Sequence, residues 1–169
     1  YKRALRLKPD YAEVYNNLGA TLKEQGKLEE AEECITQAIT SKPDYAEAHR
    51  QLSFIKKFYE YDEQFLKMEE LYNDKNISLE QLCHLNFGLA KASEDLGEYD
   101  KSFKHYSEGN SLRKKLLKYD ISHDIKIFRQ LKASYPSIPS ISLDIKSFTN
   151  NPTPVFIIGM PRSGTTLVE

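Results

Sequence analysis

Apolar residues recur with a helical period over most of the first 118 positions. In residues 12–45 the large ones fall on one face of two segments, at Tyr15, Leu18, Leu22, Leu28 and Ile35. Gly26 separates the segments and Pro43 follows the second, and both residue types interrupt helices. Small residues, at Gly19, Ala31 and Ala38, lie on the same faces. The pattern predicts two antiparallel helices that approach closely at the small residues, with the large ones filling the seam.

The pattern repeats at a fixed distance. The string KPDYAE occupies residues 8–13 and again residues 42–47, an offset of 34 residues. Thirty-four residues is the period of the tetratricopeptide repeat, and residues 12–45 resemble its consensus. We therefore expect a solenoid of antiparallel helix pairs over residues 1–118, with repeats at residues 1–11 (partial), 12–45 (full), 46–78 (divergent) and 79–118 (last). Because the sequence begins inside a repeat, we expect it to be a piece of a longer protein.

Beyond the full repeat, local signals place the helices. Asp62 is expected to cap a helix over residues 62–72, where Phe65 occupies a position that the repeat gives to a small residue. Ser78 and Gln81 have the spacing of a capping box at the start of a helix over residues 79–96. Gly97 then separates this helix from one over residues 99–117, where Ser102, Tyr106 and Gly109 keep the small, large, small phase of the repeat.

Residues 119–153 are predicted to be a helix and a linker. Ser122 is expected to cap a helix that ends near residue 134. The following segment is rich in proline, serine and threonine, a composition typical of a linker with little regular structure.

Residues 154–169, PVFIIGMPRSGTTLVE, change character. Val155 to Ile158 form an apolar, partly β-branched run that predicts a buried strand. Residues 159–164 form a loop, and a helix is expected from Thr165. A strand, a glycine loop and a helix N-terminus together make a cradle for a phosphate group. A nucleotide P-loop needs lysine where this sequence has Thr165, so a magnesium–nucleoside triphosphate is a poor ligand. The positive charge is instead on Arg162.

The PRSGTT string resembles the phosphosulfate-binding loop of sulfotransferases, and especially that of tyrosylprotein sulfotransferases. Together with the repeats and the linker, it resembles the bacterial repeat-containing sulfotransferases. The resemblance implies the start of a truncated α/β, P-loop-like sulfotransferase domain. It further implies that 3'-phosphoadenosine-5'-phosphosulfate is the co-substrate, that a tyrosine or carbohydrate hydroxyl is the acceptor, and that no metal is needed. Arg162 would be the catalytic contact to the transferred group, and the donor would be held by Arg162, Ser163, Gly164, Thr165 and Thr166. The general base and the 3'-phosphate site of this family would lie beyond residue 169, so the chain by itself is expected to be inactive.

Composition narrows the classes of function. The formal net charge is -1, which disfavours nucleic acid as a partner. No apolar run approaches the roughly 18 residues that span a membrane. Cys34 and Cys83 fit two reduced thiols, which favours the cytoplasm, although a signal peptide upstream of the repeats stays open. The four histidines have no metal-ligand spacing: His49, His84, His105 and His123.

The alternative function is an interaction scaffold that acts through the repeats alone. Asn17 on the first helix resembles the asparagine that grips peptide backbones in some tetratricopeptide grooves. In this interpretation the partner is a protein or peptide in that groove. A solvent-exposed helix face is the other interpretation of Asn16 and Asn17.

Overall fold

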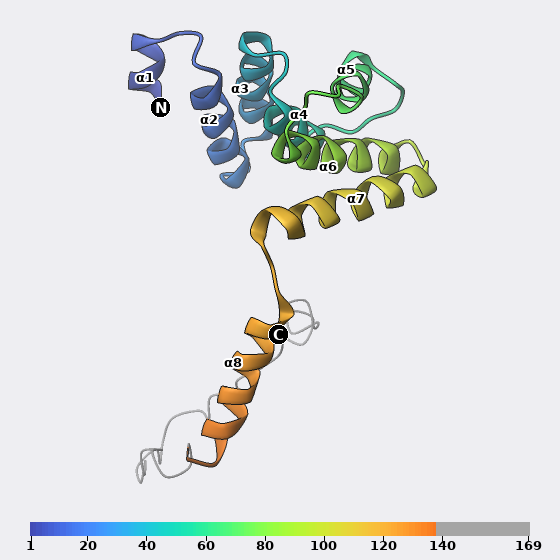
Figure 1. The fold of residues 1–169 in the computed structure, drawn as a ribbon. Coiled ribbons are helices and arrows are strands. Elements are labelled where there is room, and N and C mark those ends of the chain that lie inside the picture. Colours follow the sequence, from blue (N-terminus) through green and yellow to red (C-terminus); the bar gives the residue numbers. More distant parts are fainter. Residues whose placement is uncertain (138–169) are drawn as a thin grey trace, which may run out of the picture. The chain divides into compact units, whose positions relative to one another are not determined.

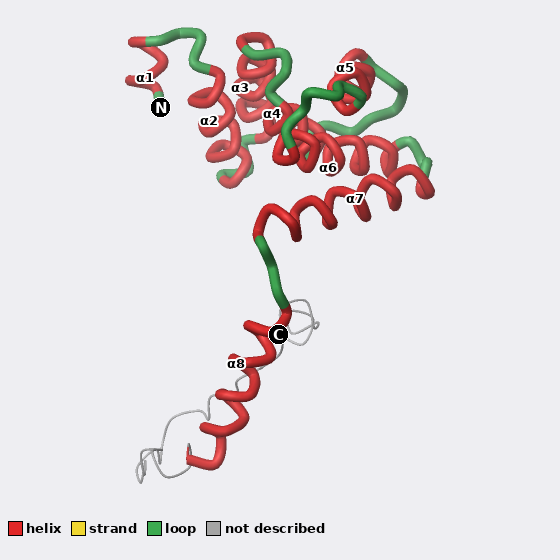
Figure 2. Tube along the Cα trace, in the orientation of Figure 1, coloured by secondary structure: helices red, strands yellow, loops and turns green. Residues whose placement is uncertain are grey.

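The computed structural model describes residues 1–137, which are mainly helical (Figures 1 and 2). The helices are α1 (Lys2–Leu7), α2 (Ala12–Glu24), α3 (Leu28–Ser41), α4 (Ala46–Ser53), α5 (Glu63–Tyr72), α6 (Leu79–Asp95), α7 (Tyr99–Leu117) and α8 (Ile121–Ser134), followed by a short 3₁₀ helix at Tyr135–Ser137. The chain divides into two units, the second of which begins at Ile121. The strand and phosphate loop predicted for residues 154–169 lie outside the described residues.

Helices α2 and α3 form the predicted antiparallel pair. Gly26 in the turn has a φ of +76°, a conformation that suits glycine and ends α2. At Gly19 the two helices are so close that an added Cβ would lie 2.5 Å from Cγ1 of Ile35. Ala31, Ile35 and Ala38 are fully buried. The close approach at small residues, inferred from the spacing, is therefore confirmed.

One residue of the predicted seam is placed differently. Leu28 was expected to fill the space between α2 and α3, but half of its surface is exposed. It is the first residue of α3, next to the turn, and α2 has already ended at Glu24. At this end of the pair the side chain stays half in solvent, and this part of the prediction is wrong.

The divergent repeat contains a short first helix and a displaced second one. Helix α4 ends at Ser53, and the chain then runs without a helix to Asp62, whose side chain accepts a 2.9 Å hydrogen bond from the backbone N–H of Phe65. The predicted cap is confirmed. Phe65, in place of a small residue, is buried in a core cluster with Ala46, Phe58, Met68, Leu85, Leu89 and Ala92. Helix α5 packs on α6 as well as on α4.

Helices α6 and α7 form the last pair. The capping box is present, because Ser78 and Gln81 each accept from the other's backbone N–H, both at 3.2 Å. Gly97 has a φ of +77° in the turn. Ser102 and Gly109 are buried against α6, where a Cβ on Gly109 would lie 3.3 Å from Cβ of Asn86. The predicted small positions of this pair are confirmed.

The second unit begins with α8. The helix ends at Ser134, as expected, but it begins at Ile121, so Ser122 lies inside its first turn. The cap predicted at Ser122 is therefore wrong by position, because the apolar Ile121 is already helical. None of the residues of α8 is buried.

Candidate protein-binding surface

The first helices of the successive pairs, α2, α4 and α6, contact one another through side chains. Lys23 on α2 places its Nζ 5.6 Å from the centroid of the Phe54 ring, which follows α4. Arg50 on α4 donates from Nε to Nδ1 of His84 on α6, at 3.0 Å. These contacts join three helices that are far apart in the sequence. We call this area the first-helix surface and define it by Lys23, Arg50, Phe54, His84 and Phe87.

A small pocket of about 280 Å³ lies within the first-helix surface. Helix α4, helix α6 and helix α7 contribute its lining, which consists of Arg50, Phe54, Cys83, His84, Phe87 and Arg113. We call it the basic pocket because two guanidinium groups line it. The Cys83 thiol donates to the carbonyl of Gly109 at 3.5 Å. Burial raises the pKa of this thiol despite the nearby arginines, so it stays protonated near neutral pH.

The neutral form of His84 follows from its surroundings. Burial, and then the positive charge of Arg50, lower the pKa of this ring below its usual value. Since Arg50 donates to Nδ1, that nitrogen carries the lone pair, and Nε2 carries the proton. The ring therefore adds one N–H donor beside the two guanidinium groups.

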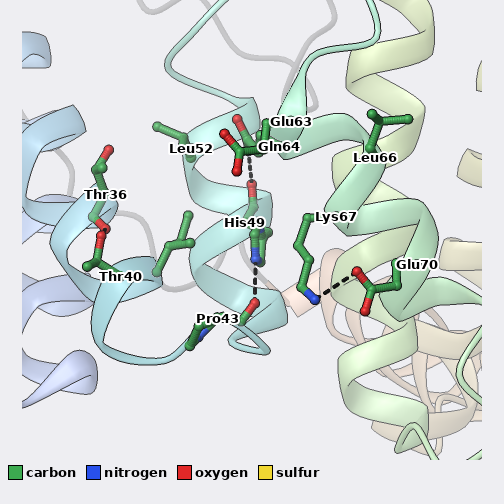
Figure 3. Close-up of a pocket in the computed structure, with 11 residues that line it drawn as sticks. Thr36, Thr40, Pro43, His49, Leu52, Glu63, Gln64, Leu66, Lys67 and Glu70 are labelled. Carbon is green, nitrogen blue, oxygen red and sulfur yellow. Dashed lines mark hydrogen bonds and ion pairs between the residues drawn. The ribbon is translucent and has the colours of Figure 1, made fainter.

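A larger hollow of about 790 Å³ separates α3 from α5, with α4 next to it (Figure 3). We call it the interhelix groove. Its apolar lining includes Ile39, Leu52 and Leu66. Two of its polar side chains are already engaged: Lys67 pairs with Glu70 at 2.8 Å, and Gln64 donates to the carbonyl of His49 at 3.1 Å.

The histidine beside this groove is structural. His49 is 1% exposed, and its Nε2 lies 2.9 Å from the carbonyl of Pro43. A carbonyl only accepts, so Nε2 is the donor. Burial lowers the pKa of His49, which keeps the ring neutral.

The first complete helix pair, α2 and α3, identifies the type of repeat in this solenoid. Residues 12–45 match the tetratricopeptide repeat family. The chain contains a tetratricopeptide repeat. Over 164 residues it is also 30% identical to an uncharacterized protein of Aquifex aeolicus (strain VF5). That alignment covers 95% of this chain and 21% of the Aquifex protein, so the chain spans about a fifth of its relative's length.

The neighbouring residues Asn16 and Asn17 on α2 differ in burial. Asn17, the predicted peptide contact, is exposed on α2, and its role in binding stays a prediction. Asn16 is fully buried, and its amide donates to the Tyr45 hydroxyl at 3.4 Å. The solvated-face interpretation is therefore wrong for Asn16. Its spacing of three residues from the buried Gly19 puts both on one helix face and is the signal that could have identified it.

The sequence interpretation did not single out Arg50 and His84. Their separation is 34 residues, the period of the tetratricopeptide repeat, which puts them at equivalent positions on successive first helices. That coincidence was the available signal. The candidate donor-binding residues Arg162, Ser163, Gly164, Thr165 and Thr166 lie outside the described residues, and their role stays a prediction.

Within residues 1–137, no helix is long and apolar enough to cross a bilayer. The same residues hold no group of three or more histidine, cysteine or acidic side chains that could bind a metal ion.

Proposed function

We propose that the repeat domain is a protein-interaction module and that a segment of a partner protein lies along the first-helix surface. The observation that carries the proposal is the continuity of this surface across α2, α4 and α6, through the contacts of Lys23 with Phe54 and of Arg50 with His84. Stacked helical repeats create extended surfaces of this kind, and many such proteins use them to bind partners.

The first-helix surface is a better candidate than the interhelix groove. Phe54 is 39% exposed and lies next to Arg50, and aromatic and arginine side chains carry much of the energy at protein interfaces. In the groove, Lys67 is already paired with Glu70. Nδ1 of His49 and Oε1 of Gln64 have no hydrogen-bond partner, but both atoms are buried and a bound partner could not reach them. The groove therefore offers fewer groups that could recognise a ligand.

The first prediction tests this choice of surface. Peptides are first selected from a displayed library for binding to the complete chain. They should bind the Phe54→Ala variant about tenfold more weakly, because the variant loses an aromatic anchor of the first-helix surface. Fluorescence anisotropy with a labelled peptide measures the change. Leu66→Ala is the matched control, since Leu66 is an exposed apolar residue of the interhelix groove. If the Leu66→Ala variant binds the peptide more weakly and the Phe54→Ala variant binds it normally, the binding site is the interhelix groove instead.

The segment GMPRSGTT supports a second activity. We propose that a longer protein containing this chain transfers a sulfuryl group from 3'-phosphoadenosine-5'-phosphosulfate to a hydroxyl of a tyrosine or a carbohydrate, with the repeats recruiting the acceptor or a partner. The support is the loop sequence, in which Arg162 supplies the positive charge and Thr165 replaces the P-loop lysine. Arg162 would meet the charge on the transferred group, while Ser163 to Thr166 would hold the 5'-phosphate.

The second prediction addresses this activity. In a longer protein that shows sulfuryl transfer, Arg162→Ala should lower turnover on the order of a hundredfold, the typical cost of removing one group that stabilises transition-state charge. Radiolabelled sulfate transfer measures it, and Arg129→Ala on the exposed part of α8 is the control. Calorimetry should show binding of adenosine 3',5'-bisphosphate without magnesium. Tight, magnesium-dependent ATP binding would argue against sulfuryl transfer.

A further inference from the structure

We infer that α8 lies on the surface of a membrane that contains anionic lipids, with its apolar side among the acyl chains and its basic side chains at the headgroups. The inference goes beyond the protein-interaction function and does not depend on it, since it concerns the second unit of the chain. The feature that carries it is the combination, on one helix, of an exposed apolar side with exposed basic residues.

The apolar side of α8 consists of large residues in solvent. Ile121, Ile125 and Phe128 succeed one another at spacings of four and three residues, which places them on one side of the helix. Leu131 extends this side by about one turn, and Tyr135 follows the helix. All five are exposed, Phe128 over 63% of its surface. A row of large apolar side chains in water marks a surface of interaction.

Positive charge is concentrated in the same part of the chain. Lys126 and Arg129 lie outside the apolar row, Lys132 borders it, and all three are exposed. The one carboxylate of α8, Asp124, is in the first turn, where the helix dipole favours a negative charge. Residues 113–132 hold seven lysines and arginines against two aspartates and no glutamate, whereas the whole chain has a net charge of -1. Such basic segments are attracted to anionic lipid surfaces.

The composition of the apolar side favours lipid over another helix. The faces that α2, α3, α4, α6 and α7 bury all include glycine, alanine or serine, which lets neighbouring helices approach closely. The apolar side of α8 has only large residues, and its small ones, Ser122, Ala133 and Ser134, lie on other sides. Among the helices with a buried face, only α5 also packs without small residues. Acyl chains adapt to large side chains, so a lipid surface needs no small residues.

The length of α8 decides how it meets the membrane. Its 14 residues extend about 21 Å, less than the roughly 30 Å of a bilayer's hydrocarbon core. The helix is also too charged to be surrounded by acyl chains. It would therefore lie in the plane of the interface, where apolar burial and attraction to anionic headgroups add together.

The third prediction uses the complete chain with a single fluorescent reporter. The sequence contains no tryptophan, so Phe128→Trp reports on the apolar side of α8 alone. With vesicles of equal parts phosphatidylcholine and phosphatidylglycerol, its emission should shift to shorter wavelength, and brominated acyl chains should quench it, because the indole enters the lipid. Vesicles of phosphatidylcholine alone should have a much smaller effect. Gln130→Trp, on the opposite side of the helix, is the matched control and should keep the emission of a tryptophan in water.

Sedimentation of the complete chain with the mixed vesicles measures the apolar contribution. The double variant Phe128→Ala with Leu131→Ala should bind at least tenfold more weakly, because inserted apolar surface is lost while alanine keeps the helix. The matched control is Tyr99→Ala with Phe103→Ala, an exposed aromatic pair of α7, which should bind normally.

The same measurement tests the basic residues. Lys126→Gln, Arg129→Gln and Lys132→Gln together should weaken binding roughly a hundredfold, the combined contribution of three basic residues at an anionic surface. High salt should weaken the binding of the unchanged chain as well. The control removes the same charge at three exposed positions of the first unit: Arg3→Gln, Lys75→Gln and Lys104→Gln. Circular dichroism and thermal unfolding check that every variant keeps its helices.

Several results would overturn the inference. Equal emission shifts for Phe128→Trp and Gln130→Trp, equal binding to both kinds of vesicle, or normal binding by the α8 variants would each contradict it. If the chain ignores vesicles but light scattering shows a dimer that the double alanine variant dissociates, a second copy covers the apolar side instead. None of these results alters the expectation for peptide binding by Phe54→Ala, so the two proposals are tested separately.

Discussion

Phe65→Ala is expected to lower the free energy of unfolding by about 3–5 kcal/mol, the usual cost of truncating a buried phenylalanine. Phe65 is 2% exposed and belongs to the cluster with Phe58, Met68, Leu85 and Leu89. Its ring also meets the Tyr61 ring edge-on, with centroids 4.8 Å apart. The cavity would open where α5 is held against α6, so the divergent repeat should lose most of its order.

Urea unfolding followed by circular dichroism measures this fourth prediction. Phe103→Ala is the matched control, because Phe103 is 74% exposed on α7, and its removal should change stability by less than about 0.5 kcal/mol. Similar unfolding midpoints for the two variants would show that α5 does not hold the core in the way described.

Gly19→Leu, the fifth prediction, should cost about 3 kcal/mol, the upper end of the range for overpacking. The first added atom, Cβ, would lie 2.5 Å from Cγ1 of Ile35 and 3.1 Å from the backbone carbonyl of Ala31. Ile35 is fully buried and cannot swing away, and the carbonyl belongs to α3. The two helices would have to separate, which would also disturb the packing of α4 on α3.

The same unfolding experiment measures the effect, with Ala20→Leu as the control. Ala20 is the next residue of α2 and is partly exposed, so leucine there should be tolerated. Equal losses at both positions would mean that the close approach of α2 and α3 does not depend on the glycine.

The sequence predicted those parts of the fold that depend on neighbours along the chain. The Asp62 cap, the capping box of Ser78 and Gln81 and the glycine turns at Gly26 and Gly97 each involve a few adjacent residues, and all were placed correctly. The early end of α4 was not foreseen, because residues 54–62 contain neither glycine nor proline. Packing of the large Phe65 side chain into the α6 core, a contact between distant segments, accompanies this departure from the regular repeat.

The candidate site was less predictable for the same reason. Asn17 was chosen by its position in the repeat, whereas Arg50, His84 and Arg113 become a site only when three helices bring them together. The 34 residues between Arg50 and His84 indicate that these two side chains occupy equivalent positions on α4 and α6. Arg113 lies on α7, the second helix of the last pair, and the repeat period does not relate it to either residue. The donor-binding loop depended on local sequence alone, and its residues lie outside the described part of the chain.

The central claim is that the first-helix surface binds a segment of a partner protein. Its most direct measurement is a two-dimensional amide NMR spectrum of the labelled chain, recorded with and without a selected peptide. We predict that the shifts concentrate at Lys23, Phe54, His84 and Phe87, on three helices at once. Shifts confined to the interhelix groove, at Thr40, Leu66 and Glu70, would contradict the claim.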